Sequence, residues 1–134
     1  MLGEKIGEFR GPAGTSRVLR GDDYRYAKIE QSWQHTGTLL GAEATNMATI
    51  TSWERVPGQG YAEGQGIVMT NDGEGAIYET TGIATFSPEG RMSIRFSATF
   101  QASGKLAALN GYLVVGEAEV DGDGNQTTTL WEWK

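Results

Sequence analysis

The strict alternation of apolar and polar side chains between residues 91 and 101 constrains this chain more than any other feature of its sequence. Apolar side chains take every second position, at Met92, Ile94, Phe96, Ala98 and Phe100. Successive side chains of a β-strand point to opposite faces of a sheet, so this segment predicts a strand with one buried and one polar face. A helical period is almost absent from the rest of the chain. The sequence therefore predicts an all-β protein.

Similar segments fill most of the chain and are separated by short runs of turn-forming residues. Strands are expected at residues 8–19, 26–35, 38–56, 60–70, 75–86, 91–101, 111–120 and 126–134. Gly, Asn, Asp and Pro separate most of them, and a turn at Thr36-Gly37 is expected between the second and the third. Only Lys105 to Asn110 suggests a helical turn, and we expect it to cover one end of the fold.

A long antiparallel meander must protect its two edge strands. It can pack as two sheets or close into a barrel. Gly60, Gly64 and Gly66 share one face of their predicted strand, where missing side chains permit tight coiling of the sheet. We therefore expect closure into an eight-stranded antiparallel barrel, as a single domain over residues 1–134.

The composition excludes several kinds of site. The chain has no Cys and one His, which rules out disulfides, cysteine nucleophiles, iron–sulfur clusters and multi-histidine metal sites within one subunit. Acidic residues number 17 against 11 basic ones, the formal net charge is −6, and the basic residues do not cluster, which disfavours binding to nucleic acid. No nucleotide, flavin or metal motif is present, so we expect no cofactor.

We expect a soluble, cytoplasmic protein without a membrane partner. No apolar stretch approaches the roughly 18 residues that cross a bilayer. The first eight residues lack both a basic segment followed by an apolar run and a cleavage signature, so export is not expected.

The acidic segment near the C-terminus has part of the spacing of a calcium-binding EF-hand loop. Asp121, Asp123, Asn125 and Glu132 match its ligand positions 1, 3, 5 and 12, but Gln126 stands where such a loop has Gly. The flanking residues alternate as strands do. A hairpin turn is the better interpretation, and no metal site is predicted.

The chain resembles small bacterial proteins of unknown function over nearly its whole length. The segments that carry the resemblance are residues 37–41 (GTLLG), 61–70 (YAEGQGIVMT), 106–111 (LAALNG) and 130–134 (LWEWK). More distantly, the segment from Gly104 to Gly111 is similar to a loop-and-turn segment of allene oxide cyclase-like and dirigent-like barrels. This second resemblance implies a calycin-type, eight-stranded barrel whose apolar cavity steers a cyclisation or binds small apolar molecules. It carries over no catalytic residue.

Glu63 is the first candidate catalytic residue. It stands on the strand face opposite the glycines, together with apolar side chains. If that face points inward, the apolar setting raises the pKa of the carboxyl and makes it a candidate general acid or base. If the glycine face points inward instead, Glu63 is solvated, as most glutamates are.

Tyr78 and Arg95 are the other two candidate catalytic residues, because together they could bind a ligand carboxylate. The alternative for Arg95 is a surface ion pair with Glu79 on the neighbouring strand. His35, the single histidine, follows Trp33 on the same strand face and could move a proton. An exposed histidine beside a turn is the alternative.

Aromatic and flexible side chains are the candidates for ligand binding. Four of the 134 residues are Trp, which is a large aromatic content for a small domain. The candidate ligand-binding residues are Trp33, Trp53, Tyr61, Gln65, Met69, Trp131 and Trp133. They could line a cavity for a flat organic ligand, or they could pack in a core or at a subunit interface.

These features predict a barrel that binds a small apolar molecule. Its catalytic form would be a cofactor-independent cyclase or isomerase that acts on a small unsaturated or aromatic substrate, with the shape of the pocket contributing most of the rate enhancement. The alternatives are a non-catalytic binding protein for small hydrophobic molecules and a barrel that serves oligomerisation. The expected partners are the small molecule and further copies of the chain.

Overall fold

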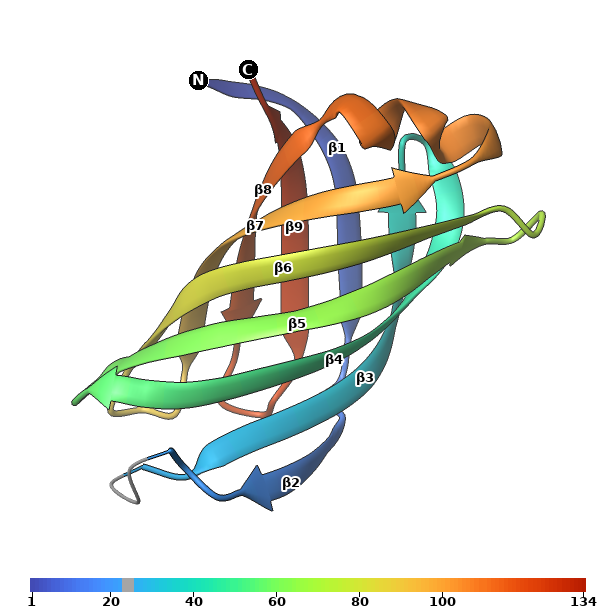
Figure 1. The fold of residues 1–134 in the computed structure, drawn as a ribbon. Coiled ribbons are helices and arrows are strands. Elements are labelled where there is room, and N and C mark those ends of the chain that lie inside the picture. Colours follow the sequence, from blue (N-terminus) through green and yellow to red (C-terminus); the bar gives the residue numbers. More distant parts are fainter. Residues whose placement is uncertain (23–25) are drawn as a thin grey trace.

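The chain forms an antiparallel β-barrel, as Figure 1 shows. In a computed structural model, which describes residues 1–22 and 26–134, nine strands and one 3₁₀ helix follow one another. They are β1 (Leu2–Gly11), β2 (Thr15–Leu19), β3 (Lys28–Leu39), β4 (Ala42–Val56), β5 (Gln59–Thr70), β6 (Gly75–Phe86), β7 (Met92–Ala102), η1 (Gly104–Gly111), β8 (Leu113–Val120) and β9 (Gln126–Trp133).

The strand order confirms the expected eight-stranded closure. Neighbouring strands follow the order β1-β9-β8-β7-β6-β5-β4-β3, and a pairing of β1 with β3 closes the ring. The additional strand β2 pairs with the first half of β3, outside the ring. In Figure 1, β2 and this half of β3 extend below the barrel.

The predicted strand over residues 8–19 is two strands in the structure. β1 ends before Pro12, which has no N–H to donate to a neighbouring strand, and β2 begins at Thr15. Both lie along the same edge of β3, where β1 pairs with residues 36–39 and β2 with residues 28–32. The interruption separates the part of this edge that closes the barrel from the part that extends beyond it.

The expected turn at Thr36-Gly37 is wrong, because β3 continues to Leu39. The chain reverses at Leu40 and Gly41, which have φ values of 49° and 80°. Gly37 is required for another reason: a Cβ atom there would lie 1.8 Å from the carbonyl oxygen of Glu8, on the closing strand β1. The glycine therefore permits barrel closure and does not form a turn.

Helix η1 seals one end of the barrel, which we call the closed end. Its Leu106 and Leu109 have no exposed surface and pack on the buried core. The backbone N–H of Lys105 donates to a Glu74 carboxylate oxygen at 2.7 Å. The side-chain amide of Asn110 donates to the carbonyl of Ala102 and accepts from its N–H, at 2.9 and 2.7 Å. The expected helical turn over one end is thus confirmed.

The opposite end, which we call the mouth, carries the turns between β4 and β5, β6 and β7, and β8 and β9. The acidic segment forms the last of these as a hairpin turn, as predicted, because Val120 pairs with Gln126 across it. One carboxylate oxygen of Asp121 accepts the backbone N–H groups of Asp123 and Asn125, at 2.9 and 3.0 Å. In the part of the chain that the structure describes, no helix is long and apolar enough to cross a membrane.

Candidate functional site

The barrel encloses a cavity of about 80 Å³. Aromatic and aliphatic side chains form most of its wall, and a few uncharged polar groups interrupt them. Principal lining residues are Phe9, Trp33, Asn46, Ile50, Ala62, Val68, Tyr78, Thr80, Ile94, Phe96, Ala98, Phe100, Ala118, Gln126, Thr128 and Leu130. Among the described residues, no charged side chain lines this cavity. For comparison, a cavity of about 150 Å³ holds benzene, so a ring-sized molecule needs some wall side chains to move.

Tyr78 is the predicted catalytic residue that reaches this interior. Its hydroxyl donates a hydrogen bond to Asn46 Oδ1 at 2.8 Å, and its ring lies 5.2 Å from that of Phe100, centroid to centroid. Gly66 makes this possible, because a Cβ atom there would lie 2.4 Å from the Tyr78 hydroxyl. Burial raises the pKa of Tyr78 to about 12, opposed by the hydrogen bond to Asn46. The phenol stays protonated at neutral pH and serves as a hydrogen-bond donor, not as a base.

Two further polar pairs of the inner wall satisfy each other. The Thr80 hydroxyl donates to the backbone carbonyl of Ser97 at 2.8 Å. The Gln126 side-chain amide donates to the Thr128 hydroxyl at 3.0 Å. Hydrogen bonding within the wall offsets the cost of burying these groups.

Trp33 and His35, unlike these pairs, each keep one ring nitrogen without a hydrogen-bond partner. Their rings stack with centroids 5.4 Å apart and planes inclined by 19°. His35 Nε2 lies 2.8 Å from the carbonyl oxygen of Pro12, which can only accept, so Nε2 carries the hydrogen and Nδ1 presents a lone pair. In the described part of the chain, Trp33 Nε1 and His35 Nδ1 are the buried side-chain nitrogens without a hydrogen-bond partner.

His35 is buried, with 1% of its surface exposed, contrary to the expectation of a solvated residue beside a turn. The physical reason is the continuation of β3 past this residue to Leu39, which places it in mid-strand. Burial lowers its pKa, and the hydrogen bond to Pro12 opposes this shift. The imidazole is therefore neutral around pH 7.

The structure does not bring Glu63 to the interior. Gly60 and Gly66 are buried on the inner face of β5, whereas Glu63 is exposed on the outer face. The premise of a buried Glu63 carboxyl is therefore wrong, and the glycine face is the one that points inward. Glu63 and Gln65 border a polar groove of about 460 Å³ on the outside of the barrel.

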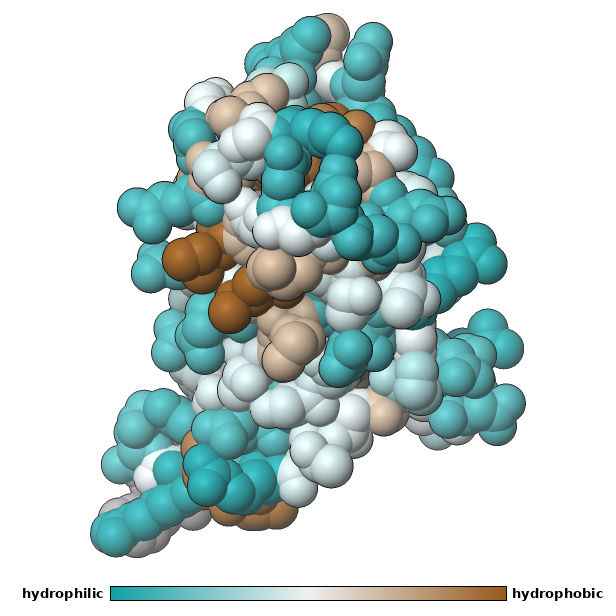
Figure 2. Space-filling view, turned by 90° about the vertical axis from the view of Figure 1, so that its right-hand side faces the viewer, coloured by the Kyte–Doolittle hydropathy of each residue, from teal (hydrophilic) through white to brown (hydrophobic). Residues whose placement is uncertain are grey.

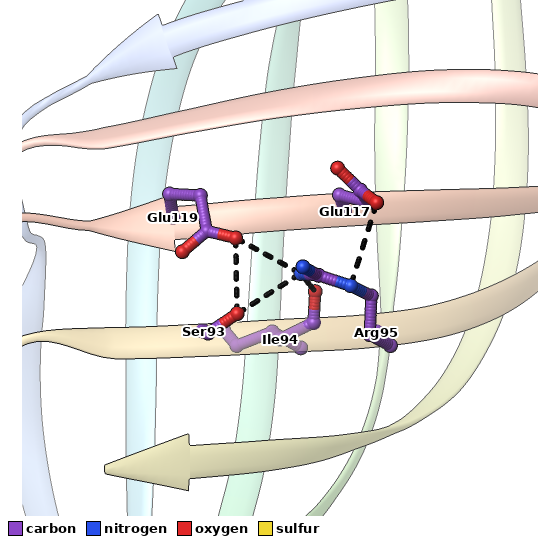
Figure 3. Close-up of polar contacts among 5 residues, drawn as sticks. All are labelled: Ser93, Ile94, Arg95, Glu117 and Glu119. Atoms are coloured by element: carbon purple, nitrogen blue, oxygen red, sulfur yellow. Dashed lines mark hydrogen bonds and ion pairs between the residues drawn. The ribbon is translucent and has the colours of Figure 1, made fainter. Parts of the chain in front are cut away.

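Arg95 also lies on the outer face, on the opposite side of the sheet from Tyr78. Figure 3 shows its guanidinium between two carboxylates of β8, with Glu119 at 2.9 Å and Glu117 at 3.4 Å. It also donates to the Ser93 hydroxyl at 3.0 Å. The expected ion pair between Arg95 and Glu79 is wrong, because Glu79 lies opposite Thr99 in the strand register. Tyr78 and Arg95 therefore cannot hold one ligand carboxylate between them.

Trp33 is the one predicted ligand-binding residue on the inner wall. Trp53 and Tyr61 form an edge-to-face pair on the outer face, with centroids 5.0 Å apart. Lys28 lies 4.5 Å from the Trp53 ring and Arg55 lies 4.0 Å from the Tyr61 ring, each measured to the ring centroid. Packing and cation–π attraction thus stabilise both aromatic rings on the outer face.

The remaining predicted ligand-binding residues also lie on the outside of the barrel. Trp131 borders a groove of about 500 Å³ together with Tyr61 and Arg95. Trp133 is 49% exposed beside β1. Met69 belongs to an apolar patch with Met47, Ile67 and Ile77, each 44–55% exposed. Figure 2 shows hydrophobic side chains on one side of the barrel framed by hydrophilic ones.

Sequence reasoning missed most of the polar groups inside the barrel. Asn46, Gln126 and Thr128 line the cavity, and so do Phe96 and Phe100. The alternation that predicts the strand over residues 91–101 already places both Phe residues on its buried face. Asn46 could have been found by the same argument, because it alternates with Ala44 and Ala48, which are buried.

Comparisons with known proteins support the fold. No family model and no curated protein matches the chain. A protein of unknown function from Clostridium acetobutylicum has a similar structure, with a TM-score of 0.79 at 15% identity over 98% of both chains. A conserved protein of unknown function from Rhodopseudomonas palustris gives 0.79 at 14% identity, over 98% of this chain and 97% of that one. A beta-barrel-like protein from Acinetobacter baumannii gives 0.75 at 16% identity, over 100% and 96%. These neighbours are uncharacterised bacterial proteins, as expected, and at this identity the likeness shows the barrel fold alone.

Proposed function

We propose that the barrel binds a small, uncharged molecule in its interior. The observation that carries this proposal is the cavity wall, which combines aromatic and aliphatic surface with polar groups and, among the described residues, has no charged side chain. Apolar walls with a few placed polar groups are typical of small-molecule sites. A buried carboxylate or ammonium would have no countercharge there, which makes charged ligands unfavourable.

The mouth is the route by which the ligand enters. Trp33, Ile50 and Phe96, which line the cavity, are partly exposed, whereas Leu106 and Leu109 at the closed end are fully buried. Partly exposed side chains have fewer packing partners and can move with less loss of contact. Their movement widens the cavity for a ring-sized ligand.

A cyclase or isomerase activity would use this same site. The segment of η1 that resembles allene oxide cyclase-like and dirigent-like barrels supports a cyclisation, and Tyr78 supports it as a buried hydrogen-bond donor. To stabilise charge that develops on a substrate oxygen, its hydroxyl would exchange the hydrogen bond to Asn46 for one to that oxygen, and the cavity wall would hold the substrate folded. A protein that binds its ligand without catalysis needs the same cavity wall, but its ligand needs no oxygen on which charge develops.

Two probes of the same ring size test the proposal. Cyclopentanone is uncharged, whereas cyclopentanecarboxylate carries a negative charge at neutral pH. We expect cyclopentanone to shift the NMR signals of inward methyl groups, such as those of Val68 and Ala98, in a saturable manner. The carboxylate should leave these signals unchanged at the same concentrations.

A matched pair of variants on β5 locates the binding. Ala62→Leu adds volume to the lining, whereas Gln65→Leu introduces the same side chain on the exposed outer face and leaves the lining unchanged. The proposal predicts that Ala62→Leu weakens cyclopentanone binding and Gln65→Leu does not. Saturable shifts confined to outer methyl groups, in the unmodified chain, would overturn the proposal.

Self-association stays a prediction that this proposal does not require. The apolar patch of Met47, Ile67, Met69 and Ile77 supports it, because exposed apolar patches often mark contact surfaces. Sedimentation of the full chain over a range of concentrations measures it directly.

A further inference from the structure

We infer that Trp33 and His35 form a polar subsite for a neutral group that accepts one hydrogen bond and donates another, such as the N–H and C=O of an amide. The inference rests on the proposed function and specifies the head group of its ligand. Among the buried side-chain atoms of the described residues, these two ring nitrogens are the ones left without a partner. One is a donor and the other an acceptor.

The orientation of His35 follows from its surroundings. A Cβ atom on Gly11 would lie 2.2 Å from His35 Cδ2, 2.8 Å from Cγ and 3.1 Å from Nε2, so the Cδ2 corner of the ring faces Gly11. Nε2 also donates to the Pro12 carbonyl. In a five-membered imidazole ring, the Nδ1–Cε1 edge lies opposite Cδ2, and the Cγ–Nδ1 edge lies opposite Nε2. Nδ1 therefore points away from Gly11 and Pro12, and His35 itself stands on the inner face of β3.

Trp33 occupies the adjacent position on the same inner face. The two residues are two positions apart in one strand, and their rings are stacked. The Trp33 side chain lines the cavity, and its Nε1 can only donate. The stack thus places an unpaired donor nitrogen on a residue of the cavity wall and an unpaired acceptor nitrogen on the buried ring packed against it.

Most other polar groups of the wall already hold at least one hydrogen bond. Tyr78 is hydrogen-bonded to Asn46, Thr80 to a backbone carbonyl, and Gln126 to Thr128. An unpaired buried donor or acceptor costs about 1–3 kcal/mol. A ligand group that forms hydrogen bonds with both ring nitrogens therefore binds more tightly than a group that pairs with only one. A ketone satisfies only Trp33, and a carboxylate satisfies only Trp33 while adding a buried charge.

An isosteric pair of probes tests this assignment. 2-Pyrrolidinone and cyclopentanone have rings of the same size with one carbonyl, and the lactam adds an adjacent N–H donor. We expect the lactam to bind about two- to tenfold more tightly, the range that one net hydrogen bond provides. Its binding should shift the Nδ1 resonance of His35 in long-range proton–nitrogen spectra of the unmodified chain, whereas the ketone should not.

Variants separate the two contacts. Trp33→Phe removes the donor to the carbonyl of both probes, so both should weaken by about two- to tenfold while their ratio persists. His35→Phe removes the acceptor, so the preference for the lactam should disappear. Trp131→Phe is the matched control on the outer face and should change neither affinity.

The outcomes distinguish this inference from the proposed function. Equal affinities with shifts of the inward methyl groups, or an unchanged His35 Nδ1 signal with the lactam bound inside, overturn the subsite and leave the binding barrel intact. The absence of shifts of inward methyl groups with both probes overturns the binding barrel as well. A lactam preference that His35→Phe abolishes supports both.

Discussion

The two ends of this barrel use the same alternating strands and differ in what covers them. At the closed end, η1 places Leu106 and Leu109 over the core with no exposed surface. At the mouth, Ile50 and Ile94 are partly exposed, and β2 lies outside the ring of eight strands (Figure 1). The difference separates a fully buried part of the core from a part that is partly accessible to solvent. The closed end contributes most of the complete burial, and the mouth is the end at which the proposed ligand would enter.

Glycines reinforce this difference within single strands. Gly82 and Gly116 flank Phe96 on the inner face, and a Cβ atom on Gly116 would lie 2.2 Å from the Phe96 ring. One aromatic ring thus fills the space that two side chains would otherwise take. A single movable ring is more easily displaced by a ligand than interlocked aliphatic side chains are.

The largest expected effect is at the closed end. Leu106→Ala removes a fully buried side chain from the core, which costs about 2–5 kcal/mol in the free energy of unfolding. Urea unfolding followed by circular dichroism measures it. Ala107→Ser on the exposed side of the same helix is the control and should change stability by less than about 0.5 kcal/mol. Equal effects of the two substitutions would contradict the sealing role of η1.

The next largest effect on stability is expected at Gly66, which lies between the two ends of the barrel. Gly66→Ala places a Cβ atom against the Tyr78 hydroxyl, so the ring must move and the hydrogen bond to Asn46 is strained or lost. We expect a loss of about 1–3 kcal/mol. Gly58→Ala is not a suitable control because Gly58 has a φ of 79°. Thr85→Ala, exposed on β6, serves instead, and a smaller loss at Gly66 than at Thr85 would refute the Tyr78 placement.

A smaller effect is expected at the mouth. Ile50→Ala removes three carbons from a partly exposed side chain and should cost about 1 kcal/mol, since part of the surface is already solvated. It also widens the cavity, so cyclopentanone should bind more tightly than to the unmodified chain. A loss of stability as large as that of Leu106→Ala would remove the distinction between the two ends.

The smallest effect concerns pH. The pKa of His35 is lowered from 6.5 in the folded protein, so the unfolded chain binds the proton more readily. The stability that His35 contributes is complete above pH 6.5 and decreases as the pH falls below it. The pKa values of Glu8 and Asp72 are lowered from 4.5 and 3.8 by basic neighbours. The stability that these two carboxylates contribute to the folded protein is therefore lost only at lower pH.

Urea midpoints between pH 7 and pH 5 therefore report mainly on His35. The unmodified protein should become less stable over this range, and His35→Gln should show a flatter profile. A rise in stability toward pH 5 that depends on His35 would mean that the imidazole is charged in the folded state.

Much of the fold could be predicted from local sequence, because the hydrophobic alternation of residues 75–102 fixes which faces are buried. The sidedness of β5 could not, since both of its faces contain apolar residues. Gly66 faces inward because the ring of Tyr78, from the next strand, occupies the space beside it. That contact depends on the register between two strands, which local pattern does not encode.

The site was predicted less well for the same physical reason. Gly37 resembles a turn residue, yet it is required by the approach of β1, about thirty residues earlier in the chain. With the turn misplaced, His35 was expected near a strand end, and its burial was missed. Leu40, at a positive φ that leucine rarely adopts, gave no turn signal.

The most direct test of a ligand site inside the barrel is the position of a bound probe. Intermolecular nuclear Overhauser effects between 2-pyrrolidinone and the methyl groups of the unmodified chain give that position. The account predicts contacts to inward methyl groups, Val68, Ala98 and Thr128 among them. Contacts only to outer methyl groups, such as those of Ile83 and Val115, would place the probe in the outer groove and contradict the account.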